Sequence, residues 1–263
     1  MSGFAPDWLA LRDPADRAAR SRRLRDRLLG HLAARGPAGP LRVIDLGCGT
    51  GATCRALVDL LPPDTEWCLV DNDPALLAVA EAEFGGRARL TLLEADLAAS
   101  VEGVLARGAD LVTSSALIDL CSADWLSRLA GAVPAGAAVY MALNYDGQEQ
   151  WEPAHAAEPR ALAAFHEHHR RDKGFGPALG AEAQAHLSRA LAARGWTVRS
   201  APSAWRLGAQ HRGLIGALAQ GSAAAVAETG ALAPETLAAW AAARAAAQRV
   251  VIGHTDMLAL PPA

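Results

Sequence analysis

The sequence predicts an α/β fold in which a parallel sheet is covered by helices on both faces. Between residues 41 and 144, five short apolar runs alternate with segments of helical periodicity, at the spacing of strand–helix–strand units. Half of the 263 residues are hydrophobic, so a chain of this length can bury a sizeable core. Together these observations indicate a doubly wound sheet.

Each expected element follows from its local pattern. Asp13-Pro14 and Asp73-Pro74 each offer a capping side chain followed by proline, which is typical of a helix start. The expected helices cover 13–35, 51–61, 74–84, 100–107, 123–132 and 180–194. The expected strands cover 41–46, 66–71, 88–96, 109–115, 137–144, 196–201 and 250–255. After residue 144 the alternation stops, and 145–178 and 203–248 read as inserts, the second of them helical.

Composition narrows the class of protein. The chain has 25 basic and 28 acidic residues, and the net charge of −3 argues against nucleic acid as the main partner. The four cysteines form no C-x-x-C pair, which favours reduced thiols in a cytoplasmic protein. No basic start precedes an apolar core at the N-terminus, and no apolar run reaches 18 residues. We therefore expect neither a secretory signal nor a membrane span.

A glycine-rich turn follows the first expected strand, in the run VIDLGCGTG at 43–51. Gly47 and Gly49 let the chain turn tightly beside a ligand, and Gly51 lets the next helix start close to it. In a parallel sheet this turn lies at the carboxyl ends of the strands, where ligands bind. The pattern G-x-G-x-x-A also fits a dinucleotide, but Asp45 would repel a pyrophosphate and suits a ligand with a positive end.

Two further acids end the next two strands. Asp71 suits the hydroxyls of a ribose in either ligand class, and Asp96 suits an adenine amino group. With these residues in place, VIDLGCGTG, LVDND (69–73) and LLEADL (92–97) resemble the three strand-end motifs of the class I S-adenosylmethionine (SAM) dependent methyltransferases. The resemblance covers residues 41 to 144 and implies SAM as cofactor, with S-adenosylhomocysteine as its product. It also implies a Rossmann-like seven-stranded sheet, order 3-2-1-4-5-7-6, with strand 7 antiparallel.

The resemblance implies a set of cofactor-binding residues. The glycine turn and Asp45 would surround the methionine part, Asp71 would bind the ribose, and Asp96 with Leu97 would bind the adenine. The expected cofactor-binding residues are Asp45, Gly47, Cys48, Gly49, Gly51, Asp71, Asn72, Asp96, Leu97, Ser114 and Ser115.

The same resemblance divides the chain, which we expect to form one domain over 1–263. The parts are an N-terminal helical lid (1–38), a SAM-binding core (39–144), an insert that covers the substrate (145–178), and the rest of the core with its helical insert (179–263).

Candidate catalytic residues come from a second cluster in the sequence. Five of the eight histidines lie between 155 and 186, and a histidine suits removal of a proton from a methyl acceptor. The alternative interpretation is that these histidines lie on a solvated helix face and have no catalytic role. His166 and His169 could also bind a metal at their i,i+3 spacing, but two further ligands are not visible, so no metal is expected. The candidates are His166, His169, Tyr145 and Asp119, the last of which could instead cap a turn.

The N-terminal segment holds eight arginines against three aspartates between residues 12 and 35. One interpretation is a face for RNA. The other is a lid over the SAM site, which we favour because no aromatic residues interleave the arginines.

The predicted function is methyl transfer from SAM to a small molecule, at oxygen, nitrogen or carbon, by a monomer or homodimer. After the fourth strand the chain reads Thr113 to Asp119, TSSALID, and lacks the Asn/Asp-Pro-Pro-aromatic run of methylases that act on nucleobase amines. Two alternatives remain open. One is a nucleic-acid methyltransferase that uses the arginine-rich helix, and the other is an enzyme that transfers or cyclises the aminocarboxypropyl group of SAM.

Overall fold

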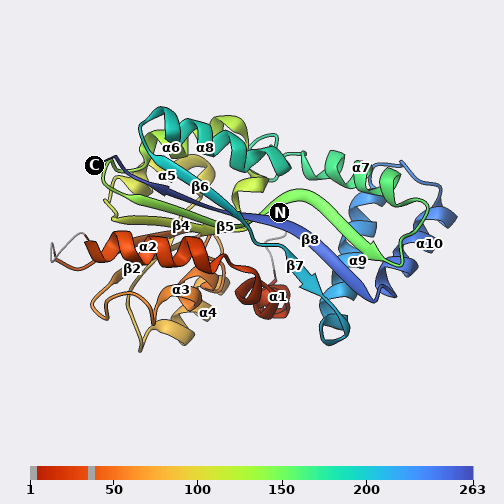
Figure 1. Cartoon of the computed structure of the whole chain (residues 1–263), viewed down its shortest axis with the longest axis horizontal. Helices are drawn as coiled ribbons and strands as arrows, with labels where there is room; N and C mark the ends of the chain where they lie inside the picture. Colours follow the sequence, from red (N-terminus) through yellow and green to blue (C-terminus); the bar gives the residue numbers. More distant parts are fainter. Residues whose placement is uncertain (1–4, 35–38, 263) are drawn as a thin grey trace.

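The computed structural model describes residues 5–34 and 39–262, which form one mixed sheet between layers of helices (Figure 1). The strand order is β3-β2-β1-β4-β5-β8-β6, with β7 paired to β8. The strands are β1 (Arg42–Leu46), β2 (Glu66–Asp71), β3 (Arg89–Glu94), β4 (Leu111–Ser115), β5 (Ala138–Glu152), β6 (Thr197–Pro202), β7 (Trp205–Leu207) and β8 (Arg249–Leu260). The first five are parallel and β8 is antiparallel, as predicted; β7 is an added strand within the expected helical insert.

Helices cover both faces of the sheet. One hydrophobic core lies under α5, α6 and α8, and a second lies under α2, α3 and α4 (Figure 1). The helices are α1 (Pro6–Ala19), α2 (Arg22–Ala34), α3 (Ala52–Leu57), α4 (Pro74–Phe84), α5 (Leu97–Leu105), α6 (Ala123–Ala132), α7 (Glu158–His169), α8 (Ala183–Ala193), α9 (Arg212–Ala227) and α10 (Pro234–Ala245). In the described ranges, no helix is both long and apolar enough to cross a membrane.

Side-chain caps set two of the helix starts beside the sheet edge. Asp73 accepts a hydrogen bond from the N–H of Ala75 at 2.8 Å, and α4 has the predicted bounds. Asp96 accepts from the N–H of Ala98 at 2.9 Å, so α5 starts at Leu97, earlier than predicted. Both caps place an acidic side chain at the carboxyl edge of the sheet.

The predicted single helix over 13–35 is wrong. The chain forms α1 from Pro6, breaks at Arg20 and Ser21, and continues as α2 up to the last described residue of this stretch, Ala34. Pro14, expected at the helix start, lies inside α1. The break has a tertiary cause, because the N–H of Ser21 donates to the buried carboxylate of Asp256 at 2.8 Å.

Strands β5 and β8 are longer than predicted and leave the sheet as a two-stranded ribbon (Figure 1). The predicted end of the fifth strand at residue 144 is therefore wrong, because β5 continues to Glu152. Register shifts occur between Met141 and Asn144 and again between Tyr145 and Glu149. These bulges bend the ribbon, which carries α7, α9 and α10 at its far end (Figure 1).

A buried arginine holds this far end together. Arg244 of α10 is 2% exposed, and its guanidinium lies 4.3 Å from the ring centres of both Trp151 and Trp240. It pairs with Glu149 of β5 at 2.8 Å and also with Glu158 of α7. One side chain thus connects the ribbon to two helices.

We predict that Arg244→Ala lowers the free energy of unfolding by about 3–5 kcal/mol, because two carboxylates lose their buried partner. Arg249→Ala is the control. Arg249 pairs with Glu152 but is largely exposed, so its loss should cost less than about 1 kcal/mol. Urea denaturation measures both changes. Equal small losses would mean that Arg244 does not hold the ribbon and its helices together.

Candidate functional site

The glycine turn links β1 to α3 and uses backbone that favours glycine. Gly47, Gly49 and Gly51 have φ values of +59°, +55° and +86°. Gly47 and Gly49 line a large cavity, whereas a Cβ at Gly51 would lie 2.6 Å from the ring of Phe84. Gly51 therefore lets the turn pack against α4, and of the three glycines only the first two face the cavity.

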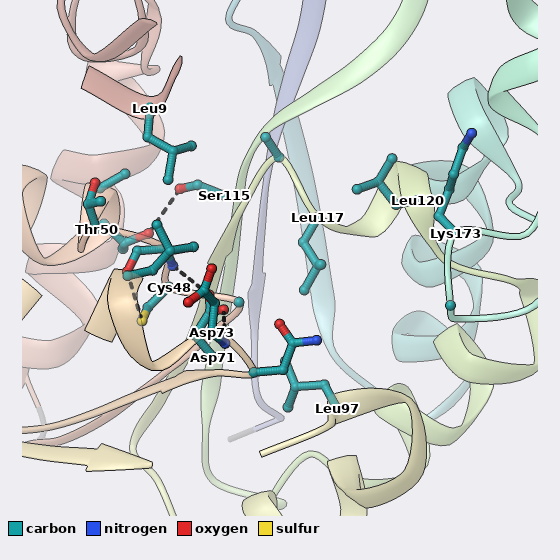
Figure 2. A pocket seen from close by; sticks show the side chains of 18 of the residues that line it. Leu9, Cys48, Thr50, Asp71, Asp73, Leu97, Ser115, Leu117, Leu120 and Lys173 are labelled. Atoms are coloured by element: carbon teal, nitrogen blue, oxygen red, sulfur yellow. Dashed lines mark hydrogen bonds between the residues drawn. The ribbon is translucent and has the colours of Figure 1, made fainter. Parts of the chain in front are cut away.

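The cavity has a volume of about 880 Å³ and opens at the carboxyl edge of the parallel strands (Figure 2). Cys48 and Thr50 of the glycine turn lie on one side of it in Figure 2, and Leu120 and Lys173 lie on the other. Among the expected cofactor residues, the cavity is lined by Gly47, Cys48, Gly49, Asp71, Asn72, Asp96, Leu97 and Ser115. The structure thus brings the three strand-end motifs to one space.

Asp71 at the end of β2 fixes the glycine turn. Its Oδ2 accepts from the N–H of Gly49 at 2.8 Å, and its Oδ1 accepts from the N–H of Asp73 at 3.1 Å. Burial raises the pKa of Asp71, while these backbone donors act in the opposite direction. The carboxylate therefore holds the turn and faces the cavity at once.

Asp45 and Ser114 lie beneath the cavity rather than on its wall. Asp45 is 1% exposed, and its Oδ1 accepts from the hydroxyl of Thr113 at 2.7 Å. Asp45 Oδ2 and Ser114 Oγ are buried and have no hydrogen-bond partner in the described part of the chain. Burial raises the pKa of Asp45 to about 6. Of the expected cofactor residues, Asp45, Gly51 and Ser114 are therefore outside the lining.

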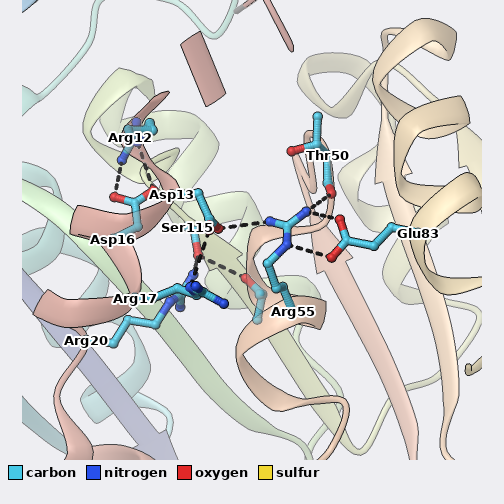
Figure 3. Close-up of polar contacts among 10 residues, drawn as sticks. Arg12, Asp13, Asp16, Arg17, Arg20, Thr50, Arg55, Glu83 and Ser115 are labelled. Atoms are coloured by element: carbon cyan, nitrogen blue, oxygen red, sulfur yellow. Dashed lines mark hydrogen bonds and ion pairs between the residues drawn. The ribbon is translucent and has the colours of Figure 1, made fainter. Parts of the chain in front are cut away.

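Helix α1 closes the cavity from the N-terminal side. Leu9, Arg12, Asp13 and Asp16 all line it, and none of them was predicted from the sequence to be a site residue. Figure 3 shows Arg12 paired with Asp16, at 2.9 Å. The high charge density of the segment was visible in the sequence, but which charges face the cavity depends on where α1 ends.

Acidic side chains dominate the cavity wall. Six aspartates line it, against two arginines and one lysine. Such a wall attracts a cation and repels a pyrophosphate. The aspartates are Asp13, Asp16, Asp71, Asp73, Asp96 and Asp172, and the bases are Arg12, Arg55 and Lys173.

The four candidate catalytic residues form one cluster beside the cavity. His169 of α7 lies 3.4 Å from the carboxylate of Asp119. Tyr145 shares a hydrogen bond of 3.0 Å with His166, and its ring centre lies 5.5 Å from that of His169. None of the four lines the cavity, but Asp119 lies in the chain between Leu117 and Leu120, which do.

Burial and charge set the protonation of this cluster. Burial, reinforced by Glu149, raises the pKa of Tyr145, so its hydroxyl stays protonated and donates to Glu149 at 3.0 Å. Burial lowers the pKa of His166, so its ring is neutral near pH 7. Asp119 Oδ1 is buried and finds no hydrogen-bond partner among the described residues. The cluster thus contains neutral hydrogen-bonding groups and one acceptor oxygen without a donor.

Sequence reasoning missed His254 of β8. Its ring is buried between those of Tyr145 and Trp205, with centres 6.3 and 4.7 Å away. Burial lowers the pKa of His254 to about 4, and its Nδ1 donates to the carbonyl of Ile252. A histidine in an apolar terminal strand was the available signal. The described residues contain no group of three or more His, Cys, Asp or Glu side chains placed to hold a metal ion.

Comparison with known proteins gives a family for the central part of the chain. Residues 43–133 match the family model described as a methyltransferase domain. The biotin biosynthesis bifunctional protein BioCD of Bordetella avium (strain 197N) is 32% identical over 128 residues, which are 46% of this chain and 25% of that protein. The chain thus matches about a quarter of the length of that relative.

Some solved structures are similar to the chain at low sequence identity. The YcgJ protein from Bacillus subtilis has a TM-score of 0.50 at 13% identity, with 90% of this chain and 99% of that chain covered. The cyclopropane synthase MmaA2 from Mycobacterium tuberculosis has a TM-score of 0.49 at 15% identity, with 97% and 94% covered. The similarity to the YcgJ protein supports the fold of this chain and says nothing about its function.

We predict that Asp45→Asn changes the pH dependence of stability. The folded protein raises the pKa of Asp45 from 3.8 to about 6, so its contribution is favourable below pH 3.8 and is lost as pH rises through 6. The shift corresponds to about 3 kcal/mol. Relative to wild type, the variant should therefore gain about 3 kcal/mol in unfolding free energy between pH 3 and pH 7.

Denaturation at several pH values measures this gain. The control is Asp59→Asn, because Asp59 lies exposed at the surface and pairs with Arg87 there. If the unfolding free energy of Asp45→Asn changes with pH in parallel with that of wild type, the folded protein does not disfavour the charged form of Asp45.

Proposed function

We propose that the protein transfers the methyl group of SAM to a small-molecule acceptor, at oxygen, nitrogen or carbon, because residues 43–133 match the model of a methyltransferase domain. The observation that carries this proposal is the acidic cavity at the glycine turn, where six aspartates face three bases. SAM bears a positive sulfonium and an ammonium group, which such a wall attracts, whereas the pyrophosphate of a dinucleotide would be repelled.

The residues around the cavity fit SAM in chemistry as well as in charge. Asp71 would accept hydrogen bonds from the ribose, and Asp96 and Leu97 would hold the adenine, with Asn72 beside them. Gly47, Cys48, Gly49 and Ser115 would surround the methionine part, over the buried oxygens of Asp45 and Ser114. When bound, SAM supplies a methyl group on a good leaving group. The protein then has to align the acceptor and remove its proton where needed.

The acceptor would bind between the cofactor cavity and the ribbon. Asp119 lies between Leu117 and Leu120 in the sequence, and both leucines line the cavity. Asp119 and its partner His169 are therefore the candidate pair next to the cavity wall. We assign the proton-accepting role to His169, with Asp119 holding its ring, and a hydrogen-bonding role to Tyr145 and His166. In this assignment α1, within 1–38, is the lid, and α7, within 145–178, covers the acceptor.

The residues that line the cavity also bear on the type of acceptor. The wall of the cavity is lined by α1, the strand ends and the loop at 172–175, which favours a small acceptor over a nucleic acid. A monomer or homodimer in the cytoplasm stays our prediction.

We predict that the purified protein binds SAM with one site per chain and does not bind NAD. Asp71→Ala should lower the SAM affinity by about 100-fold or more, because two charge-assisted hydrogen bonds of about 1.5–3 kcal/mol each are lost. Asp64→Ala, on an exposed loop, is the control and should keep wild-type affinity. Calorimetry that finds NAD binding without SAM binding would refute the cofactor assignment.

We predict that His169→Ala and Asp119→Asn reduce turnover by about 10²–10⁴-fold and leave SAM affinity unchanged, because they act on the acceptor's proton. His168→Ala is the matched control, since His168 pairs with Glu228 instead. Turnover is followed as S-adenosylhomocysteine formed from SAM in the low-molecular-weight fraction of a cell extract.

Two outcomes of this assay would count against the assignment. Full turnover in both variants would mean that the insert covers the site but contributes no proton-accepting residue. Release of methylthioadenosine in place of S-adenosylhomocysteine would mean that the aminocarboxypropyl group is moved or cyclised.

A further inference from the structure

A second cavity, of about 230 Å³, lies on the other side of α1, between the N-terminal helices and α3. Five of its nine lining residues are arginines, and no acidic side chain lines it. The arginines are Arg17, Arg20, Arg22, Arg25 and Arg55, and the remaining residues are Ser21, Ala56, Leu57 and Tyr140. Guanidinium groups around one small space repel one another unless an anion lies between them.

Acids around this cavity offset part of the charge of the five arginines. Arg17 and Arg55 share the carboxylate of Asp13, at 3.3 and 3.0 Å (Figure 3). Arg55 also pairs with Glu83, and Arg25 pairs with Asp26 at 2.8 Å. Three acids thus serve three arginines. Two buried carboxylates lie behind the wall, because Asp256 accepts from the N–H of Ser21 and the hydroxyl of Tyr140, and the charge of Arg20 acts on Asp45. Arg22 is left without an acidic partner among the described residues.

Arg20 and Arg22 both have hydrogen-bonding capacity to spare. Arg20 donates from its terminal nitrogen to Ser115 Oγ at 2.6 Å, but its Nε and other terminal nitrogen are buried without a partner in the described chain (Figure 3). Arg22 is exposed and makes no hydrogen bond or ion pair with any residue of the described ranges. A buried guanidinium edge without an acceptor is costly, and an anion in the cavity would supply that acceptor.

We propose that this cavity binds a phosphoryl group, as free phosphate or as the phosphate of a small molecule. The planar forks of several arginines suit its tetrahedral oxygens. Because a water takes up about 30 Å³, the cavity holds one such group with a few waters and is too small for a nucleotide.

The site is separate from the acidic cavity but touches it. Arg20 reaches Ser115, and Arg55 donates to the carbonyl of Thr50 at 3.0 Å; both partners line the acidic cavity. A phosphoryl group can therefore bind while the acidic cavity is filled, and its presence changes the electrostatics of that wall.

The test is calorimetry of the full chain with inorganic phosphate, without SAM. We expect saturable binding at one site, weakened about tenfold or more by Arg22→Gln, because one charge-assisted hydrogen bond is lost. Arg27→Gln is the matched control, because Arg27 is exposed on the same helix and lies outside the cavity. It removes the same charge and should leave the phosphate affinity within about twofold.

Further arms separate the sources and the alternatives. If glycerol phosphate binds more tightly than inorganic phosphate, the ligand is a phosphorylated small molecule. If only inorganic phosphate binds, the ligand is the free ion. The proposal is overturned if neither binds, or if Arg27→Gln weakens binding as much as Arg22→Gln. It is also overturned if SAM and phosphate compete, because the arginines would then serve the cofactor. Single-stranded RNA is the last probe. If it binds with steep salt dependence and loses affinity equally in both variants, the arginines form an open RNA-binding surface and the proposal is overturned.

Discussion

The buried carboxylate of Asp256 in β8 fixes the segments that surround the acidic cavity. Its Oδ2 accepts from the N–H of Ser21 at 2.8 Å and from the hydroxyl of Tyr140 at 3.1 Å, and its Oδ1 accepts from the N–H of Leu143 at 2.8 Å. Asp256 is fully buried, so these three donors replace the water that it loses. Leu143 has a φ of +58°, a costly conformation for leucine, which the bond to Asp256 helps to hold.

Both sides of the proposed active site follow from these bonds. The bond to Ser21 lies at the break between α1 and α2, and the break lets α1 turn so that Leu9 and Asp13 reach the cavity. The bond to Leu143 lies at the bulge where β5 leaves the sheet, and the bent ribbon brings α7 to the sheet edge, with His169 against Asp119. A single side chain in the last strand thus positions the lid and the acceptor side together.

The same residue explains why the sequence predicted some parts of the molecule and not others. The strands of the parallel core and the glycine turn rest on local patterns, and the resemblance to the methyltransferases implied the strand order. All of these were predicted. The broken helix at Ser21 and the extended β5 were not, because Ser21 and Asp256 are 235 positions apart in the chain. The N-terminal signal at Pro14 was also misleading, since proline is tolerated within α1. Alternation along β1 could have shown that Asp45 lies below the cavity, but position at the strand end alone could not.

Charged residues of α1 and of the break after it line two cavities. Arg12, Asp13 and Asp16 line the acidic cavity, while Arg17 and Arg20, further along the chain, line the basic one. The two are not independent, because Asp13 pairs with Arg17 and also with Arg55, and Arg55 belongs to both walls. An anion beside Arg17 weakens its attraction for Asp13 and leaves that carboxylate to Arg55. Any ligand that binds one cavity therefore changes the affinity of the other, and by linkage the effect is reciprocal.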